Sequence, residues 1–139
     1  MTNPVILMKT ELGEIYLKLH PEQAPLTVAN FLRYVDEGRY RGAAFYRAVR
    51  PDNQPQSPVK IEVIQGGLGM EEHPQKLGPI PHETTAATGL RHLDGAISMS
   101  RLEPGSAHSE FFICISDQPE LDFGGRRNPD GQGFAAFGR

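Results

Sequence analysis

The sequence predicts a single, mainly β domain of barrel or sandwich type. Two observations carry this prediction. Short apolar or β-branched runs recur along the chain, and turn-forming segments separate them, since the chain contains 15 glycines and 12 prolines. Only one segment has a convincing helical pattern. The 139 residues contain no internal repeat and no linker, so we expect residues 1–139 to form one domain with one core.

The first two strands are expected to form a hairpin. Val5–Thr10 and Glu14–Leu19 are both rich in strand-forming residues, and a tight Glu-Leu-Gly link joins them. In the second run apolar residues alternate with more polar ones, which is typical of a strand with one buried face.

An amphipathic helix is predicted after this hairpin. Val28, Phe31, Leu32 and Val35 are spaced i, i+3, i+4, i+7, and Gly38 is placed to end the helix. Further strands are expected at the remaining apolar runs, which are Ala44–Val49, Val59–Ile64, Ala96–Ser100, Phe111–Ser116 and Phe134–Phe137.

The segments between these runs are rich in glycine and proline. Arg50–Pro58 and Gly124–Gly133 are expected to be exposed loops. Gly66–Gly69, with the sequence GGLG, is interpreted as a turn, because it matches neither a dinucleotide fingerprint nor a phosphate-binding loop. Phe134–Arg139 has the pattern of a strand that is just beginning, and a closed barrel would need a further strand to cover its edge.

Charge and composition argue against several classes of partner. The net charge of −3, with acidic and basic residues interspersed, gives no basic stripe for nucleic acid and no polybasic segment for a membrane surface. The sequence starts without a signal-peptide pattern, so a cytoplasmic location is expected. The single cysteine, Cys114, excludes an internal disulfide and is interpreted as a small buried hydrophobic residue.

Familiar catalytic and metal-binding patterns are weak. The five histidines show no i, i+4 pair and no acidic or cysteine neighbours at ligand spacing, so no metal and no cofactor are expected. Ser106, His108 and Ser109 place nucleophile and base types together, but there is no GxSxG elbow and no evident orienting acid. A hydrolase is therefore a distant alternative.

Three less familiar features remain, and their order along the chain matters. Arg47 lies in the apolar run FYRAVR, Gln65 in VIQGG, and Phe112 in SAHSEFFI; taken singly, each has an ordinary structural explanation. FYRAVR, however, resembles the FHRVI motif of the cyclophilins, and VIQGG resembles their MxQGG motif. GAISMSR…GSAHSEFFICIS resembles their GxxSMAN…GSQFFI block.

This resemblance covers essentially the whole chain, because the opening hairpin and helix also look like the corresponding cyclophilin segment. LDFGG and GFAAFGR look more bacterial than eukaryotic. The resemblance implies a cyclophilin-type peptidyl-prolyl cis-trans isomerase. It also implies a closed antiparallel eight-stranded β-barrel with capping helices, and a substrate groove on the outside of the barrel.

The resemblance assigns a role to each matching residue. Arg47 falls on the catalytic arginine, and Gln65 falls on the glutamine that hydrogen-bonds the substrate backbone. The other positions implied to bind substrate are the pocket floor Phe112, the pocket walls Val63, Leu121 and Phe134, the main-chain-binding positions Ser100 and Arg101, and Glu110, which replaces the usual glutamine.

The departures from the family pattern lead to further expectations. Glu62 stands where the family has an aromatic residue, and Glu120-Leu121 stand where many relatives carry a tryptophan, which this chain lacks. Because the tryptophan is missing, we expect weak or no cyclosporin binding. The resemblance itself implies proline-containing peptides and unfolded polypeptides as partners. The alternative function is a non-catalytic proline-peptide binding module or chaperone that has lost turnover through Glu62, Arg101 and Glu110.

A last expectation concerns the end of the chain. Relatives continue past the FGR segment, so the C-terminal helix and last strand are expected to be missing here. We expect either self-association through the uncovered barrel edge or reduced stability.

Overall fold

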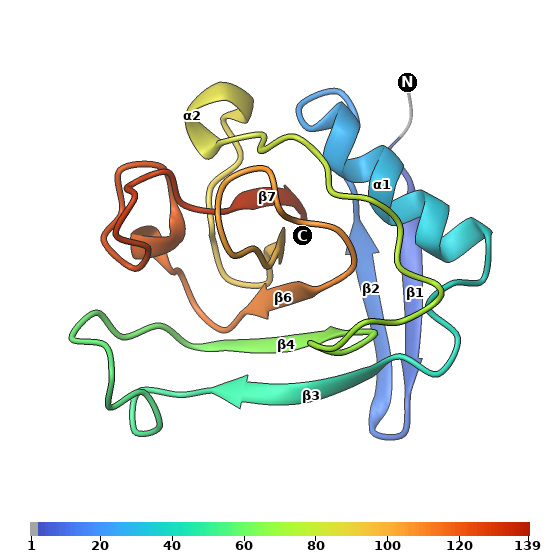
Figure 1. Cartoon of the computed structure of the whole chain (residues 1–139), viewed down its shortest axis with the longest axis horizontal. Coiled ribbons are helices and arrows are strands. Elements are labelled where there is room, and N and C mark those ends of the chain that lie inside the picture. Colours follow the sequence, from blue (N-terminus) through green and yellow to red (C-terminus); the bar gives the residue numbers. More distant parts are fainter. Residues whose placement is uncertain (1–2) are drawn as a thin grey trace.

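Antiparallel strands dominate the structure, a computed structural model that describes residues 3–139 (Figure 1). The elements in chain order are β1 (Val5–Thr10), β2 (Gly13–Lys18), α1 (Pro25–Asp36), β3 (Ala44–Val49), β4 (Val63–Gly67), α2 (Thr85–Thr88), β5 (Ile97–Met99), β6 (Phe111–Cys114), the 3-10 helix η1 (Pro119–Leu121) and β7 (Ala135–Gly138). None of the helices in this described part is long and apolar enough to cross a membrane.

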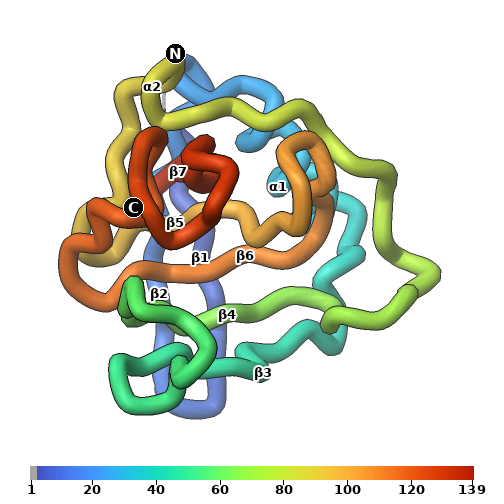
Figure 2. The backbone as a smooth tube through the Cα atoms, turned by 60° about the vertical axis from the view of Figure 1, so that its left-hand side comes forward, coloured from blue at the N-terminus to red at the C-terminus, as the bar shows by residue number. Residues whose placement is uncertain are grey.

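The strands form two sheets. β1 and β2 make a two-stranded hairpin, and the other sheet has the order β3-β4-β6-β5-β7. The end of β2 runs along β7, because Lys18 N–H donates to Arg139 O at 2.9 Å, His20 N–H donates to Phe137 O at 2.9 Å, and Leu19 bridges Gly138. The hairpin and the five-stranded sheet are therefore joined by backbone hydrogen bonds. Figure 2 shows the hairpin crossing behind the strands of the larger sheet.

The predicted mainly β fold, the opening hairpin and the first helix are confirmed. Thr10 pairs with Gly13 across the tight link of the hairpin. The helix begins with Pro25 in its first turn, where a missing N–H costs nothing. Closure into an eight-stranded barrel and self-association stay predictions. Among the described strands, β1 and β3 stand at the ends of their sheets, whereas β7 has neighbours on both sides.

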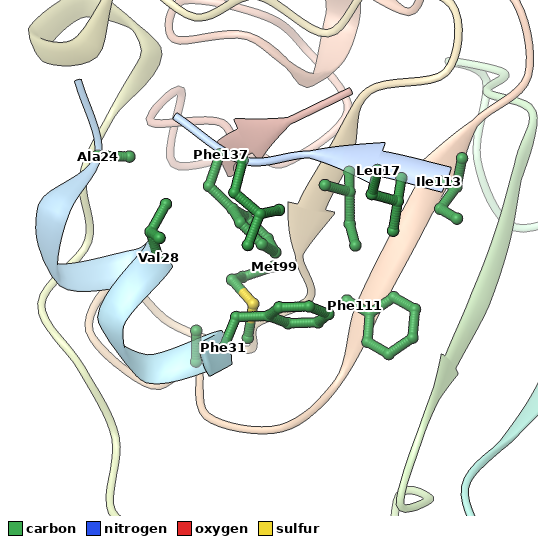
Figure 3. Packing of buried hydrophobic residues seen from close by; sticks show 11 residues of the cluster. Leu17, Ala24, Val28, Phe31, Met99, Phe111, Ile113 and Phe137 are labelled. Atoms are coloured by element: carbon green, nitrogen blue, oxygen red, sulfur yellow. The ribbon is translucent and has the colours of Figure 1, made fainter. Parts of the chain in front are cut away.

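The larger hydrophobic core lies between α1 and the sheets. Figure 3 shows Val28 and Phe31 of α1 directed toward Phe137 and Met99. The Phe31 ring is fully buried and meets Phe111 edge-on, with 5.7 Å between ring centroids. This packing holds α1 against the sheet and buries one face of β6. Side chains of alternate residues on β6 project from the opposite face, which is available for a site.

One predicted strand and one predicted turn have different bounds in the structure. The run expected as a strand over Val59–Ile64 becomes a strand only at Val63. The reason lies in the Gln54 side chain. Its Nε2 donates to Ile61 O and its Oε1 accepts from Ile61 N–H, so the Ile61 backbone is not available to pair with a neighbouring strand. The turn expected over Gly66–Gly69 starts late, because its first two glycines belong to β4. A Cβ at Gly66 would lie 2.9 Å from the Phe45 ring, so glycine permits this close pairing of β3 and β4.

The two predicted loops are loops in the structure, but they are not wholly exposed. Gln54 is only 5% exposed. Arg127 of the second loop donates from Nη1 to Val59 O at 2.7 Å and also to Gln54 Oε1. The two loops are therefore in contact through the Arg127 side chain. Both lie on the left of Figure 1.

Candidate active site

The centre of the site is a row of side chains across three neighbouring strands. Arg47 on β3 pairs with Gln65 on β4, and Gln65 pairs with Phe112 on β6. Directly opposed residues of antiparallel strands project from the same face of a sheet. The three motif residues, which are far apart in the sequence, therefore lie side by side on one surface.

This row opens into a cavity of about 310 Å³. Every residue predicted to act on substrate lines it: Arg47, Val63, Gln65, Ser100, Arg101, Glu110, Phe112, Leu121 and Phe134. Sequence reasoning missed several other lining residues, notably Val49, Ile61, Met70, Lys76 and Arg127.

The apolar part of the cavity is built around Phe112. Val63 and Leu121 are both buried, and Phe134 meets the Phe112 ring edge-on with 5.4 Å between centroids. Ile61 supplies the adjoining wall, whereas Glu62 is not among the lining residues. Glu62, which stands where the family has an aromatic residue, therefore contributes no wall here. The result is a recess lined by apolar side chains.

Arg47 stands beside this recess with its guanidinium available. The residue is exposed, and within residues 3–139 no carboxylate lies within ion-pair distance of it and no hydrogen bond occupies it. A guanidinium stays charged at working pH and presents several donors in a fixed plane. The arrangement is a charged donor next to an apolar recess.

Comparison with known proteins agrees with this geometry. The model of the family described as cyclophilin type peptidyl-prolyl cis-trans isomerase/CLD matches residues 5–139. The chain belongs to this family. It is 37% identical to peptidyl-prolyl cis-trans isomerase A of Dickeya dadantii, over 99% of this chain and 66% of that protein. It is 32% identical to peptidyl-prolyl cis-trans isomerase B of Escherichia coli, over 96% of this chain and 75% of that protein.

Solved structures show the same fold. A cyclophilin type peptidyl-prolyl cis-trans isomerase of Cryptosporidium parvum superposes with a TM-score of 0.73 at 21% identity, covering 99% of this chain and 76% of that one. The same protein studied in the presence of the dipeptide Ala-Pro gives a TM-score of 0.72 at 21% identity, over 98% and 77% of the two chains. The mainly β cyclophilin fold is therefore established for this chain.

Glu110 has a different environment from the one its predicted substrate contact suggests. Its carboxylate accepts hydrogen bonds from Tyr46 OH at 2.7 Å and from Ser109 Oγ. It also accepts from the backbone N–H groups of Leu68 at 3.1 Å and Gly69 at 2.8 Å. The carboxylate thus holds the segment that follows β4.

Tyr46 connects Glu110 to Gln65. Gln65 Nε2 donates to Tyr46 OH at 3.2 Å, while Tyr46 OH donates to Glu110. Burial, and then the hydrogen bond to Glu110, raise the pKa of Tyr46 well above its ordinary value of 10. The phenol therefore stays protonated and fixes the orientation of the Gln65 amide in this cyclophilin.

Replacing Glu110 by glutamine is expected to raise KM for a proline peptide about threefold and to lower the free energy of unfolding by about 1–3 kcal/mol. A neutral amide has one acceptor oxygen and faces four donors, so some of these donors lose their partner. Kinetics and urea unfolding measure both effects. The exposed Glu103→Gln is the matched control, and equal behaviour of the two variants would contradict the role of Glu110.

The Arg101 side chain is bound within the protein, and the predicted contact of the Ser100-Arg101 main chain with substrate stays a prediction. The Arg101 side chain is 1% exposed and forms two parallel hydrogen bonds with Asp130, one of them Nη1 to Oδ2 at 2.9 Å. It donates to Gly133 O as well, and its guanidinium carbon lies 5.0 Å from the Phe134 ring centroid. The side chain anchors the second loop against the pocket wall. Ser100 N–H is likewise occupied, by Glu110 O at 3.0 Å.

The floor of the recess rests on a buried histidine that sequence reasoning did not single out. The His92 ring stacks on Phe112 with 5.9 Å between centroids. Its Nδ1 lies 2.7 Å from Asp122 Oδ1, and its Nε2 lies 2.8 Å from Ser98 Oγ. The ring is thus held from both nitrogens, which fixes the position of the Phe112 ring above it.

Stability is expected to fall in acid through Asp122. Burial alone would raise the pKa of Asp122, but the hydrogen bonds from the His92 side chain and backbone outweigh it and lower this pKa below its ordinary value of 3.8. A group with a lowered pKa stabilises the fold above its unfolded value, and this contribution is lost as the pH falls through the folded value. Urea midpoints at pH 6 and pH 3 should therefore diverge less in Asp122→Asn than in the wild type; equal divergence would contradict the assignment.

Other chemistry finds little support in the geometry. Ser109 is fully buried and donates to Glu110, while Ser106 Oγ donates to Glu103 O at 2.6 Å. His108 Nδ1 lies 3.1 Å from Ser109 Oγ, but no acidic side chain of residues 3–139 hydrogen-bonds His108 to orient it. Within residues 3–139 no group of three or more potential metal ligands converges.

Proposed function

We propose that this chain catalyses cis-trans isomerisation of X-Pro bonds in polypeptides and so assists protein folding, with Arg47 as its catalytic residue. The row formed by Arg47, Gln65 and Phe112 across β3, β4 and β6 carries the proposal. It combines a charged donor, a neutral amide and an apolar recess at one point. The Ala-Pro dipeptide studied with the Cryptosporidium relative supports a proline-containing ligand.

The reaction breaks no covalent bond. Rotation about an X-Pro bond takes tens to hundreds of seconds, because the planar amide resists twisting with a barrier of roughly 18–20 kcal/mol. A catalyst has only to bind the twisted amide better than either planar isomer. As resonance is lost, the proline nitrogen becomes pyramidal and regains a lone pair that can accept a hydrogen bond.

Arg47 would supply the donor for this lone pair. The recess formed by Val63, Phe112, Leu121 and Phe134 would hold the pyrrolidine ring and exclude water, which strengthens a charged hydrogen bond. Gln65, oriented by Tyr46, would hold the flanking peptide backbone. A turnover of about a thousand per second would need roughly 7 kcal/mol of differential stabilisation, which is reasonable for these contributions together.

Exchange spectroscopy on a short Ala-Pro peptide tests this function. We expect substoichiometric protein to accelerate exchange between the cis and trans peptide signals. Binding without faster exchange would instead support the non-catalytic proline-peptide module or chaperone. The availability of Arg47 and the retention of Gln65 favour the enzyme.

Cyclosporin is expected to bind with a Kd weaker than micromolar. Where many relatives carry a tryptophan, this chain has Glu120, whose carboxylate pairs with Arg126 at 2.7 Å. A charged pair in place of an indole removes an apolar contact and a donor N–H. Isothermal titration calorimetry measures the affinity, and a submicromolar Kd would refute the prediction.

A cytoplasmic location is part of the same proposal. Cys114 is 1% exposed, and burial raises the pKa of its thiol to about 12. The thiol is therefore inert at neutral pH, in agreement with its interpretation as a small buried hydrophobic residue. A chain with one buried thiol and no disulfide suits a reducing compartment.

A further inference from the structure

The cavity carries a marked imbalance of charge. Its charged lining residues are Arg47, Lys76, Arg101, Arg127 and Glu110. The Arg101 charge is matched by Asp130, and the Glu110 carboxylate is turned to donors of its own chain. Lys76 Nζ donates to two backbone carbonyls, those of Gly69 and Glu71, each at 2.6 Å.

Of the cavity cations without a carboxylate partner in residues 3–139, Lys76 is held by these two backbone carbonyls, whereas Arg47 and Arg127 keep free guanidinium donors. Across residues 3–139, neither has an acidic side chain within ion-pair distance. Burial, and after it the charge of Arg47, lower the pKa of Arg127, which means that the two cations are close enough to affect each other. Both stay charged at neutral pH. Two like charges at one cavity favour any ligand that brings a negative charge between them.

The position of Arg127 is well defined. Its Nη1 donates to Val59 O at 2.7 Å and to Gln54 Oε1, and Gln54 itself is buried and bound to the backbone of Ile61. No acceptor from residues 3–139 meets Nε or Nη2. The guanidinium is thus held by one nitrogen and keeps donors for a ligand in the cavity that Arg47 lines.

We propose that this site selects peptides with an aspartate or glutamate next to the proline, and that Arg127 is the specificity-determining residue. The proposal rests on the proposed isomerase function, because it concerns the same cavity. A carboxylate would accept a charge-assisted hydrogen bond from the free donors of Arg127 and would relieve its repulsion with Arg47. Bound substrate would then supply the counter-charge that neither Arg47 nor Arg127 finds among residues 3–139.

Four short peptides test the proposal. Two carry glutamate immediately before or immediately after proline, and two carry glutamine at the same positions as neutral isosteres. For each, exchange spectroscopy gives kcat/KM, and chemical-shift titration gives Kd. At low salt we expect at least one glutamate peptide to exceed its glutamine partner by roughly threefold to tenfold in both quantities. Salt at 0.5 M should shrink this ratio, since it screens exposed charges.

Arg127→Gln should bring the glutamate-to-glutamine ratio close to one. Arg126→Gln is the matched control, because Arg126 is the adjacent residue, is exposed and pairs with Glu120 outside the cavity. That variant should keep the wild-type ratio. Arg127→Lys retains the charge and should keep most of the glutamate-to-glutamine ratio. This variant separates the role of charge from a structural effect of the substitution on the loop.

The outcomes separate selectivity from the isomerase function. Acceleration of all four peptides with no advantage for glutamate would refute the selectivity and leave the isomerase function standing. No acceleration of any peptide would refute the isomerase function, while the Kd ratios would still decide the selectivity. A glutamate advantage that survives Arg127→Gln would remove Arg127 from its role.

Discussion

Arg47→Ala is expected to lower kcat/KM for a proline peptide by roughly tenfold or more while leaving the fold intact. One lost charge-assisted hydrogen bond to the twisted amide, worth about 1.4 kcal/mol or more, gives a change of this size. The fold should survive because Arg47 is exposed and its side chain has no hydrogen-bond or ion-pair partner within residues 3–139, while its backbone pairing with Gln65 does not depend on the side chain. Exchange spectroscopy measures the rate, and circular dichroism with urea unfolding checks the fold.

Arg47→Lys adds a sharper comparison. Lysine keeps the charge but replaces the planar fork by a single flexible ammonium group. An intermediate rate would indicate that both the charge and the geometry contribute. Near-normal activity in Arg47→Ala would remove Arg47 from the catalytic role altogether.

Phe31→Ala is expected to lower the free energy of unfolding by roughly 3–5 kcal/mol, a large part of the stability of a domain of this size. The Phe31 ring contacts the rings of Tyr40, Phe111 and Phe137, and these come from three different parts of the chain. Its removal leaves a cavity where α1 meets the sheets. Urea unfolding followed by far-UV circular dichroism measures the loss.

Phe123→Ala is the matched control for this prediction. Phe123 is 50% exposed, so its truncation should change the free energy of unfolding by no more than about 0.5 kcal/mol. If Phe31→Ala cost as little as this control, the packing of α1 would not depend on the aromatic cluster.

Much of the fold was predictable because its signals are local. The alternation in the opening hairpin and the helical spacing of Val28, Phe31 and Val35 each lie within one short segment. The start of β4 was not predictable in this way. It depends on the Gln54 side chain, which satisfies the backbone of Ile61 from a position outside the strand.

In the candidate site, too, the residues with a local sequence signal were predictable and those that depend on distant partners were not. Motif matching singled out Arg47, Gln65 and Phe112, because these residue types and their order recur together in cyclophilins, and the structure brings all three to one cavity. The uses of Glu110 and Arg101 depend on Tyr46 and Asp130, which are 64 and 29 residues away in the sequence. No local pattern records such partners. Arg127 was missed for a similar reason, since a loop arginine reads as exposed until the fold brings it to Gln54.

The backbone hydrogen bonds between the end of β2 and β7 have a consequence for the order of folding. Lys18 and Arg139 exchange two backbone hydrogen bonds across most of the described sequence. During synthesis the β1-β2 hairpin emerges before β3, β4, β5 and β6, and the strand against which it docks emerges only after them. Contacts of such wide sequence separation form slowly, because a long intervening chain must first be ordered. We therefore expect the docking of the hairpin on β7 to be slower than the formation of the hairpin itself.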